Sequence, residues 1–261
     1  FDLNDRMWVG TRFGGINIYD SGKEKFLHFK SSKSDKNAMV GDNVTGFAED
    51  DYGNFYVSTD GGGLNYYNRE SNSFTHIVAT PDIPNGLVNN KILALFRASD
   101  GTIWIGYWNG GFSVYNPFTE DFTHYIHEPD NPNSLVGNSV FEIYEDKEGI
   151  MWIGTWGNGV SKFNRDFNSF TNYRNNPADN TTFPNSGCVM IREDHLGKIW
   201  FATEGAGVCI FDRSTEVFTN YMISEEEGSL SSEAAFSLYE DSKNRMWVGT
   251  NGGGVCLYNR E

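Results

Sequence analysis

The stretch Met151-Trp152-Ile153-Gly154-Thr155 is one of six similar five-residue stretches in the sequence. Each has an aromatic residue in second place, and these residues lie 48 positions apart four times and 47 positions apart once: Trp8, Tyr56, Trp104, Trp152, Trp200 and Trp247. A fixed period of this length is typical of a repeat architecture, which determines the fold class before any single motif is considered.

One period divides into four predicted strands. In the period that contains Trp152, they cover residues 140–144, 151–155, 160–164 and 170–173, and turns rich in Asp, Asn and Gly separate the first three. Four short antiparallel strands per repeat of about 40–50 residues are the signature of a β-propeller blade. The periodic aromatic residue is then expected to fill the space between adjacent blades.

The sequence therefore predicts an all-β fold, a β-propeller of four-stranded antiparallel blades. The six repeat units cover about residues 1–43, 44–90, 91–138, 139–186, 187–233 and 234–261. Four units are complete, the first lacks its first strand and the last lacks its fourth. Because a propeller must close to protect its edges, either the six units close imperfectly or the native chain supplies further blades. The second alternative is favoured, which makes the chain part of a seven-bladed propeller.

Composition excludes some classes of partner. The 261 residues carry a net charge of −15, which argues against nucleic acid, whose phosphates require a basic surface. The sequence has no signal peptide and no apolar run of about 20 residues, so no membrane contact is expected for this segment. It begins at Phe1 and is interpreted as a piece of a longer protein.

The three cysteines, Cys188, Cys209 and Cys256, are predicted to be buried small apolar residues.

A binding face is predicted where the second strands end. Strand direction alternates within a blade, so the turn after the second strand and the long polar connection after the fourth open on the same face. Functional residues often lie in such loops on a rigid scaffold. The residue after the Thr position of each second strand differs between blades, and these six are the candidate ligand-binding residues: Arg12, Asp60, Trp108, Trp156, Glu204 and Asn251.

Trp108 and Trp156 lie outside the repeated aromatic position and are expected on one rim, in adjacent blades. An exposed aromatic face near carboxylates and amides suits a sugar. Two alternatives remain open: the tryptophans cap the blade ends against neighbouring loops, or they belong to a protein-binding patch.

No catalytic or metal site is predicted. His28, His76 and His124 are spaced one period apart, in the outermost strands of different blades, so they cannot converge on one ion. Glu-Asp pairs recur before the first turn, where an Asp usually accepts hydrogen bonds from backbone amides. No unique carboxylate pair of the glycosidase kind is found, and no cofactor is expected.

The full repeat pattern resembles a known family. It reads Asp-x-x-Gly-x-hydrophobic-Trp-hydrophobic-Gly-Thr-x-x-Gly-Gly, then a hydrophobic strand, Tyr-Asn/Asp and Phe-Thr-x-Tyr, and it is clearest in residues 149–173 and 197–221. This pattern is similar to the two-component regulator propeller repeat. The resemblance implies the periplasmic sensor region of a hybrid two-component system of gut Bacteroidetes. That family combines two seven-bladed propellers, an immunoglobulin-like domain, a membrane helix, a histidine kinase and a response regulator, and its ligands are oligosaccharides from polysaccharide breakdown.

The expected function is therefore ligand sensing, without enzymatic activity in this segment. The expected partners are an oligosaccharide and further blades and signalling domains of the same chain, and a homodimer is left open. Two alternatives remain: a propeller lyase or glycosidase, and a structural interaction scaffold. The full-length product would discriminate among them, because a membrane helix followed by a kinase indicates a sensor.

Overall fold

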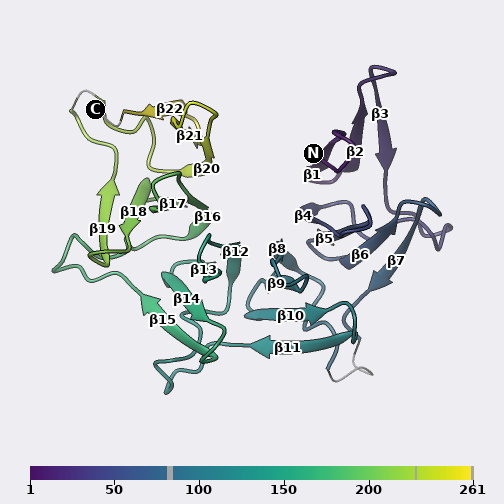
Figure 1. Cartoon of the computed structure of the whole chain (residues 1–261), viewed down its shortest axis with the longest axis horizontal. Helices are drawn as coiled ribbons and strands as arrows, with labels where there is room; N and C mark the ends of the chain where they lie inside the picture. The colour runs from purple at the N-terminus through teal and green to yellow at the C-terminus, as the bar shows by residue number, and fades with distance from the viewer. Residues whose placement is uncertain (81–84, 227, 260–261) are drawn as a thin grey trace. The chain divides into compact units, whose positions relative to one another are not determined.

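A computed structural model describes residues 1–80, 85–226 and 228–259. It confirms the all-β fold: the regular elements of these residues are strands, arranged in antiparallel sheets of three or four (Figure 1). The chain divides into two compact units, Phe1–Tyr125 and Ile126–Glu261. Across the three described ranges, no helix is long and apolar enough to cross a membrane.

The first unit contains three sheets. Their strands, in groups by sheet, are β1 (Met7–Thr11), β2 (Gly15–Asp20) and β3 (Lys25–Phe29); β4 (Val44–Glu49), β5 (Phe55–Thr59), β6 (Gly63–Asn68) and β7 (Ser73–Ile77); β8 (Ile92–Arg97), β9 (Ile103–Tyr107), β10 (Phe112–Asn116) and β11 (Asp121–Tyr125).

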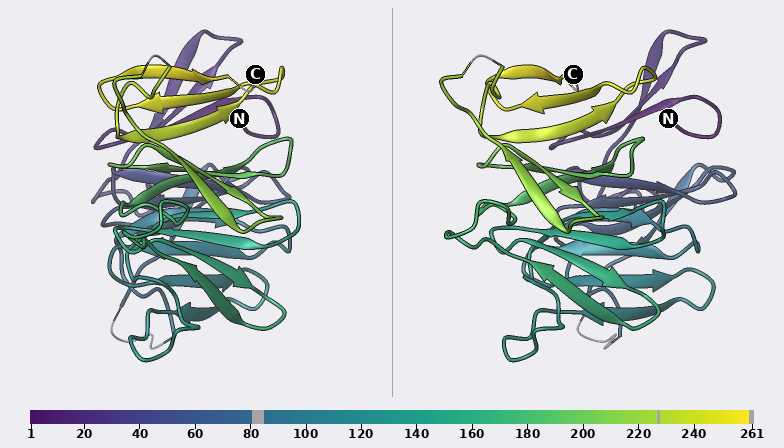
Figure 2. Two further views of the ribbon diagram at one scale, coloured as in Figure 1. Left: turned by 90° about the vertical axis from the view of Figure 1, so that its left-hand side faces the viewer. Right: turned by 60° about the vertical axis from the view of Figure 1, so that its left-hand side comes forward.

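The second unit also contains three sheets. Their strands are β12 (Val140–Glu145), β13 (Met151–Thr155), β14 (Val160–Asn164) and β15 (Ser169–Tyr173); β16 (Cys188–Glu193), β17 (Ile199–Thr203), β18 (Val208–Asp212) and β19 (Val217–Tyr221); β20 (Ala235–Glu240), β21 (Met246–Thr250) and β22 (Gly254–Tyr258). In Figure 2 the sheet of β20–β22, in yellow, lies next to the green sheet of β16–β19.

Every sheet is a meander, in which strands that are consecutive in sequence pair with each other. As predicted, four sheets have four strands and the sheets at the two ends of the sequence have three. Within the described residues, the inner edge of β1 and the outer edge of β22 have no partner strand. These sheets are the blades of a β-propeller.

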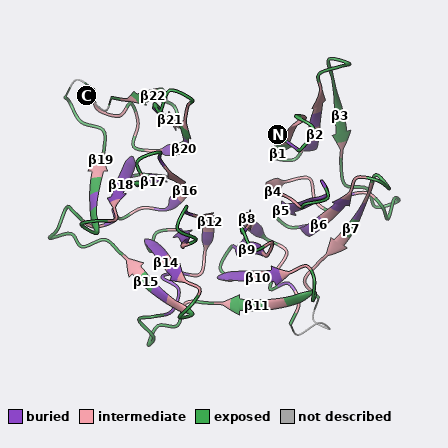
Figure 3. Cartoon of the chain, viewed as in Figure 1, coloured by how far each residue is buried: buried purple, intermediate pink, exposed green. Residues whose placement is uncertain are grey.

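The repeated aromatic residue fills the space between neighbouring sheets of a unit, as predicted. Trp152 meets the rings of Phe201 and Phe211 in the next sheet edge-on, with centroids 5.6 and 5.3 Å apart. Figure 3 shows that the middle strands are mostly buried and that β3 is exposed. Four of the repeated aromatic residues are buried, namely Tyr56, Trp104, Trp152 and Trp200, and Trp8 and Trp247 in the three-stranded sheets are partly buried.

In four of the sheets, an aspartate in the first turn orients the repeated tryptophan. Asp146 accepts hydrogen bonds from the backbone N–H groups of Glu148 and Ile150, and its second oxygen accepts the indole N–H of Trp152 at 2.7 Å. The turn geometry and the packing of the tryptophan therefore depend on one side chain. The same indole bond recurs in three other sheets, as Asp2–Trp8, Asp194–Trp200 and Asp241–Trp247.

The third sheet, where Ala98 replaces the aspartate, has a substitute acceptor. Thr102 accepts the indole N–H of Trp104 at 3.1 Å, and Asp100 in turn accepts the hydroxyl of Thr102. Thr102, four residues after Ala98, thus replaces the missing aspartate as the acceptor of the indole N–H.

An arginine connects this turn to the next sheet. Arg213 places its guanidinium 3.0 Å from Asp146, and Arg69 lies 3.0 Å from Asp2; both carboxylates are fully buried. A buried carboxylate requires a partner charge, so these ion pairs link neighbouring blades. Sequence reasoning missed them, although Arg69, Arg165 and Arg213 stand at the ends of third strands at the repeat spacing.

The three cysteines are free thiols. Cys188 and Cys209 are buried, as predicted. Cys256 is only half-buried, because β22 has no outer neighbour in the described part of the chain.

Candidate ligand-binding rim

The six candidate residues, called the rim residues below, occupy equivalent places in their blades. Each directly follows a second strand. In five blades its backbone N–H donates to the carbonyl of the residue before the first strand, at 2.8–3.2 Å: Asp60 to Asn43, Trp108 to Lys91, Trp156 to Ser139, Glu204 to Gly187 and Asn251 to Ala234. Among the described residues, Arg12 makes no such bond, because β1 is the first strand of its three-stranded sheet. The backbone register therefore holds five of the rim residues in the same way.

The turn that follows each rim residue is also fixed. Thr155 donates its hydroxyl to the carbonyl of Gly159 at 2.7 Å, and the corresponding threonines of β1, β5, β17 and β21 do the same. The turn lies against the long connection that precedes its blade; for example, the N–H of Gly205 donates to Ser186. Turn and connection thus open on one side of each blade, as the strand directions predicted.

Rim side chains differ in exposure. Arg12, Asp60, Trp108 and Asn251 are exposed, and Trp156 and Glu204 are half-buried. The structure places three of them in the first unit and three in the second: Arg12, Asp60 and Trp108, then Trp156, Glu204 and Asn251. Their joint use by one ligand remains a prediction.

The two tryptophans have different surroundings. Trp156 stacks on Phe141 with centroids 4.8 Å apart, and it covers Gly187 so closely that a Cβ there would lie 2.8 Å from the indole. This packing favours the alternative in which Trp156 caps a blade end. Trp108 keeps 45% of its surface exposed, which leaves it the better candidate for stacking on a ligand.

The long connections are anchored by buried apolar residues, which sequence reasoning missed. At one recurring position, an apolar residue of each connection enters the core, and the set is Met39, Leu87, Leu135, Phe183 and, half-buried, Leu230. Their spacing is again 48 residues, or 47 for the last, so the period would have revealed them. An anchored loop presents its polar residues at fixed positions.

A polar clamp closes each of three connections. Asp42, Asn90 and Asn138 accept the backbone N–H of Ser31, Ala79 and His127, respectively, at 2.7 Å. In the second unit, outer-strand asparagines add a further tie: Asn172 donates to the carbonyls of Pro132 and Ser134, and Asn220 to those of Asn180 and Thr182. These bonds make the loops part of the scaffold.

Two open hollows lie between these loops and the outer strands of the second unit. One, of about 600 Å³, is formed by residues 127–133 and 170–174, and the other, of about 540 Å³, occupies the equivalent place one repeat later. Their walls carry proline rings, amides and, in the first hollow, Arg174. A third hollow, of about 570 Å³, includes the rim residue Asn251 beside Phe236 and Val255.

The histidines have structural partners. His28, His76 and His124 each bond a side chain of the adjoining third strand: Asn17 at 2.6 Å, Asn65 at 3.1 Å and Ser113 at 2.7 Å. In residues 1–80, 85–226 and 228–259, no three His, Cys, Asp or Glu side chains gather as a metal site would require. The repeated carboxylates are likewise engaged in turns and in ion pairs with arginine.

Comparison with protein families gives three matches along the chain. Residues 86–109, 134–157 and 229–252 match the family model of the two component regulator propeller. The chain carries two-component regulator propeller repeats. This confirms the resemblance inferred from the sequence.

Each matched regulator propeller segment has the same structural content. It starts beside the buried loop anchor, includes the first and second strands with their turn, and ends just after the rim residue. The repeat is thus the part of the blade that joins the anchor to the rim.

Solved structures share the fold. The extracellular domain of BT3049 from B. thetaiotaomicron, assigned to a hybrid two component system, is 26% identical with a TM-score of 0.82, covering 98% of this chain and 32% of its own. PorZ, a surface component of the type-IX secretion system of Porphyromonas gingivalis, is 17% identical with a TM-score of 0.73, covering 97% and 37%. Virginiamycin B lyase from Staphylococcus aureus is 13% identical with a TM-score of 0.68, covering 98% and 81%.

The chain therefore spans about a third of the length of the sensor domain that it resembles. The likenesses to PorZ and to the lyase show the fold alone at these identities. A search of curated proteins finds no match.

Proposed function

We propose that this chain is the ligand-sensing propeller segment of an extracytoplasmic, periplasmic hybrid two-component sensor, and that its ligand is an oligosaccharide from polysaccharide breakdown. The observation that carries the proposal is the 26% identity, over 98% of the chain, to the extracellular domain of BT3049. The histidine kinase, the membrane helix and the remaining blades would then lie elsewhere in the full-length protein. Ligand binding would shift the balance between two arrangements of the sensor region.

The rim supports a carbohydrate ligand in chemical terms. A sugar offers an apolar C–H face to an aromatic ring and hydroxyls to amides and carboxylates. Trp108 supplies an exposed ring, and Asp60 and Asn251 are exposed polar residues at the equivalent place in other blades. Backbone hydrogen bonds fix the positions of these residues before binding, which reduces the entropy lost on binding.

The repeated carboxylates support a function without catalysis. Asp146 and Glu193 both lie within 3.1 Å of the Arg213 guanidinium, and Asp146 also orients Trp152. Carboxylates engaged in this way hold blades together. The likeness to a lyase concerns the fold alone and carries no catalytic residue over to this chain.

The test is calorimetry of the native sensor region against a panel of oligosaccharides, with and without Trp108→Ala. Loss of a stacking aromatic should weaken binding by about tenfold or more. Phe118→Ala is the matched control, because Phe118 is 82% exposed in the turn at the other end of the same blade, after β10.

Equal weakening by both variants, or none by Trp108→Ala, would remove Trp108 from the site. No heat with any glycan would contradict the carbohydrate ligand. Shortened glycans recovered after incubation would favour the lyase or glycosidase alternative instead.

A further inference from the structure

Three exposed lysines lie close together in the long connection between β3 and β4: Lys30, Lys33 and Lys36. A span of this length cannot separate their Cα atoms by more than about 22 Å. None of the three forms an ion pair with a described residue. Because the protein has 35 acidic and 20 basic residues, a cluster of unpaired cations is unexpected on its surface.

The carboxylates of the same connection are bound to other groups. Asp35 accepts the backbone N–H of Asn37 at 2.9 Å. Asp42 accepts the backbone N–H and the hydroxyl of Ser31, at 2.7 and 3.0 Å. These bonds shape the loop and leave the ammonium groups of the lysines available to an anion from outside the chain.

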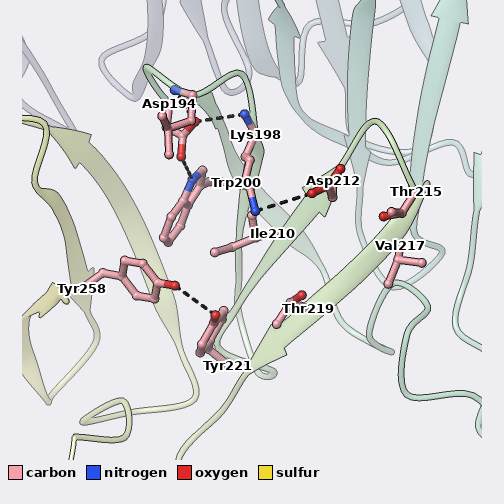
Figure 4. Close-up of a pocket in the computed structure, with 11 residues that line it drawn as sticks. Asp194, Lys198, Trp200, Ile210, Asp212, Thr215, Val217, Thr219, Tyr221 and Tyr258 are labelled. Atoms are coloured by element: carbon pink, nitrogen blue, oxygen red, sulfur yellow. Dashed lines mark hydrogen bonds and ion pairs between the residues drawn. The ribbon is translucent and has the colours of Figure 1, made fainter. Parts of the chain in front are cut away.

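Cations at the opposite ends of the blades are used differently. Arg69 lies 3.0 Å from Asp2 and links two blades of the first unit. In the second unit, Lys198 lies 3.5 Å from Asp212, as Figure 4 shows. Cations at that end therefore stabilise the scaffold, whereas the three lysines at the rim end have no such role in the described structure.

Bonds to an outer strand hold the connection in place. The backbone N–H of Phe74 donates to the carbonyl of Asn37 at 2.8 Å, and Nε2 of His76 lies 3.4 Å from the carbonyl oxygen of Lys36. Met39 is buried in the core beyond them. The backbone that carries the lysines is thus fixed before any ligand binds, which reduces the cost of ordering it.

The same connection contacts the rim turn of the first blade. Gly15, at the end of that turn, donates its N–H to the carbonyl of Asp42 at 3.0 Å, and a Cβ at Gly15 would lie 3.3 Å from Cγ of Lys30. The turn carries the rim residue Arg12, whose guanidinium lies 5.2 Å from the ring centroid of Phe13. Turn and connection therefore present their cations on one side of the blade.

The repeat itself does not require lysines at these positions. Two repeats later, Pro129 and Pro132 occupy the places of Lys33 and Lys36. Those prolines belong to a connection that has the same buried anchor, Leu135, so the fold of the loop is compatible with uncharged residues. The charges of the first connection are thus available for recognition.

We propose that this cationic patch, formed by Arg12, Lys30, Lys33 and Lys36, binds the acid group of an anionic oligosaccharide, either a uronic acid carboxylate or a sulfate ester. The inference rests on the proposed function and names the class of its ligand. Guanidinium and ammonium groups form charge-assisted hydrogen bonds with both kinds of anion. The serines between the lysines offer hydroxyl groups to the sugar ring.

The next rim residue sets the direction of the bound glycan. Asp60 is an exposed carboxylate that accepts the side-chain amide of Asn43 at 3.2 Å. A second acid group close to Asp60 would be repelled. The acid residue of the ligand therefore lies over the first blade, and neutral sugar residues lie toward Asp60 and Trp108 in the same unit.

The test is calorimetry of the native sensor region with matched pairs of glycans. One pair is tetragalacturonate and its methyl ester, and the other is a sulfated carrageenan tetrasaccharide and its desulfated form. The acid member of one pair should bind about tenfold or more tightly than its neutral member, and the pair that shows this identifies the acid group. Raising the salt concentration from about 0.05 M to about 0.5 M should remove most of the preference, because salt screens exposed charges.

A triple variant with Gln in place of the three lysines should lose the preference for the acid member. The matched control changes the net charge equally at three exposed lysines outside the patch and should keep it: Lys25→Gln, Lys147→Gln and Lys243→Gln. Because all six positions are exposed, both variants should fold, and their circular dichroism spectra check this.

Two results would overturn the inference and leave the proposed function intact. One is equal or tighter binding of the neutral members, which indicates a neutral glycan. The other is an equal loss of preference in both triple variants, which indicates an effect of net charge rather than of this patch. Absence of heat with these glycans and with the wider panel would contradict the proposed function itself, and the inference with it.

Discussion

Trp152 and Trp156 lie four residues apart in one blade and differ in what holds them. Trp152 is buried between two sheets, donates its indole N–H to Asp146 and meets two phenylalanine rings of the next sheet. Trp156 is half-buried and packs on Phe141 at the blade end. At the scale of single residues, the repeated aromatic position and the rim therefore contribute differently to stability.

Replacing Trp152 by Ala should lower the free energy of unfolding by roughly 3–5 kcal/mol, as for other buried large aromatic residues. Trp156→Ala should cost about 1–2 kcal/mol, because less area is lost and one stacked partner remains. Denaturant unfolding of both variants measures the difference. Similar losses would contradict the division of the tryptophans into core and rim.

The reactivity of each cysteine should likewise depend on how deeply its thiol is buried. Burial raises the pKa of the Cys188 and Cys209 thiols well above the usual range, so neither should react in the folded protein. Cys256, half-buried beside the open edge of β22, should be alkylated by iodoacetamide under native conditions. Mass spectrometry before and after unfolding counts the labelled thiols; native labelling of Cys209 would show that the sheet opens.

At the scale of elements, neighbouring first strands are joined by an ion pair. Glu142 of β12 lies 3.1 Å from Arg192 of β16. Burial raises the pKa of Glu142 to about 7, against the opposing effect of Arg192. The contact between these two strands is therefore sensitive to pH.

Between its ordinary pKa of 4.5 and about 7, Glu142 binds more protons in the folded protein than in the unfolded chain. Its contribution to stability is complete below this window and is lost as the pH rises through it. Glu142→Gln should therefore make the free energy of unfolding depend less on pH between about 5 and about 8. Urea unfolding at several pH values measures the slope, with the exposed Glu225→Gln as control; an unchanged slope for Glu142→Gln would contradict the assignment.

At the scale of the whole molecule, burial is distributed unevenly along the chain. The second strands β5, β9, β13 and β17 are buried throughout, whereas most residues of β3 and β22 are exposed. In repeat proteins each unit is stabilised mainly by its neighbours, so local stability should follow this distribution.

Hydrogen exchange of the chain should show this order. Amides of β9, β13 and β17 should exchange most slowly, and those of β3 and β22 fastest, with a difference of about tenfold or more in protection. The measurement is exchange followed by mass spectrometry of peptides. Uniform protection of all strands would show that the sheets open together.

The sequence alone determined the all-β class, the strand pattern and the repeat family, because strand alternation and a 48-residue period are local or periodic signals. The same period also contained Arg213 and the loop anchor Phe183, but their roles depend on which surfaces of stacked sheets meet. The exposure of Trp108 and the packing of Trp156 were decided only by tertiary structure. Each of them depends on contacts between residues far apart in the sequence, where packing, rather than residue type, determines whether a side chain is covered.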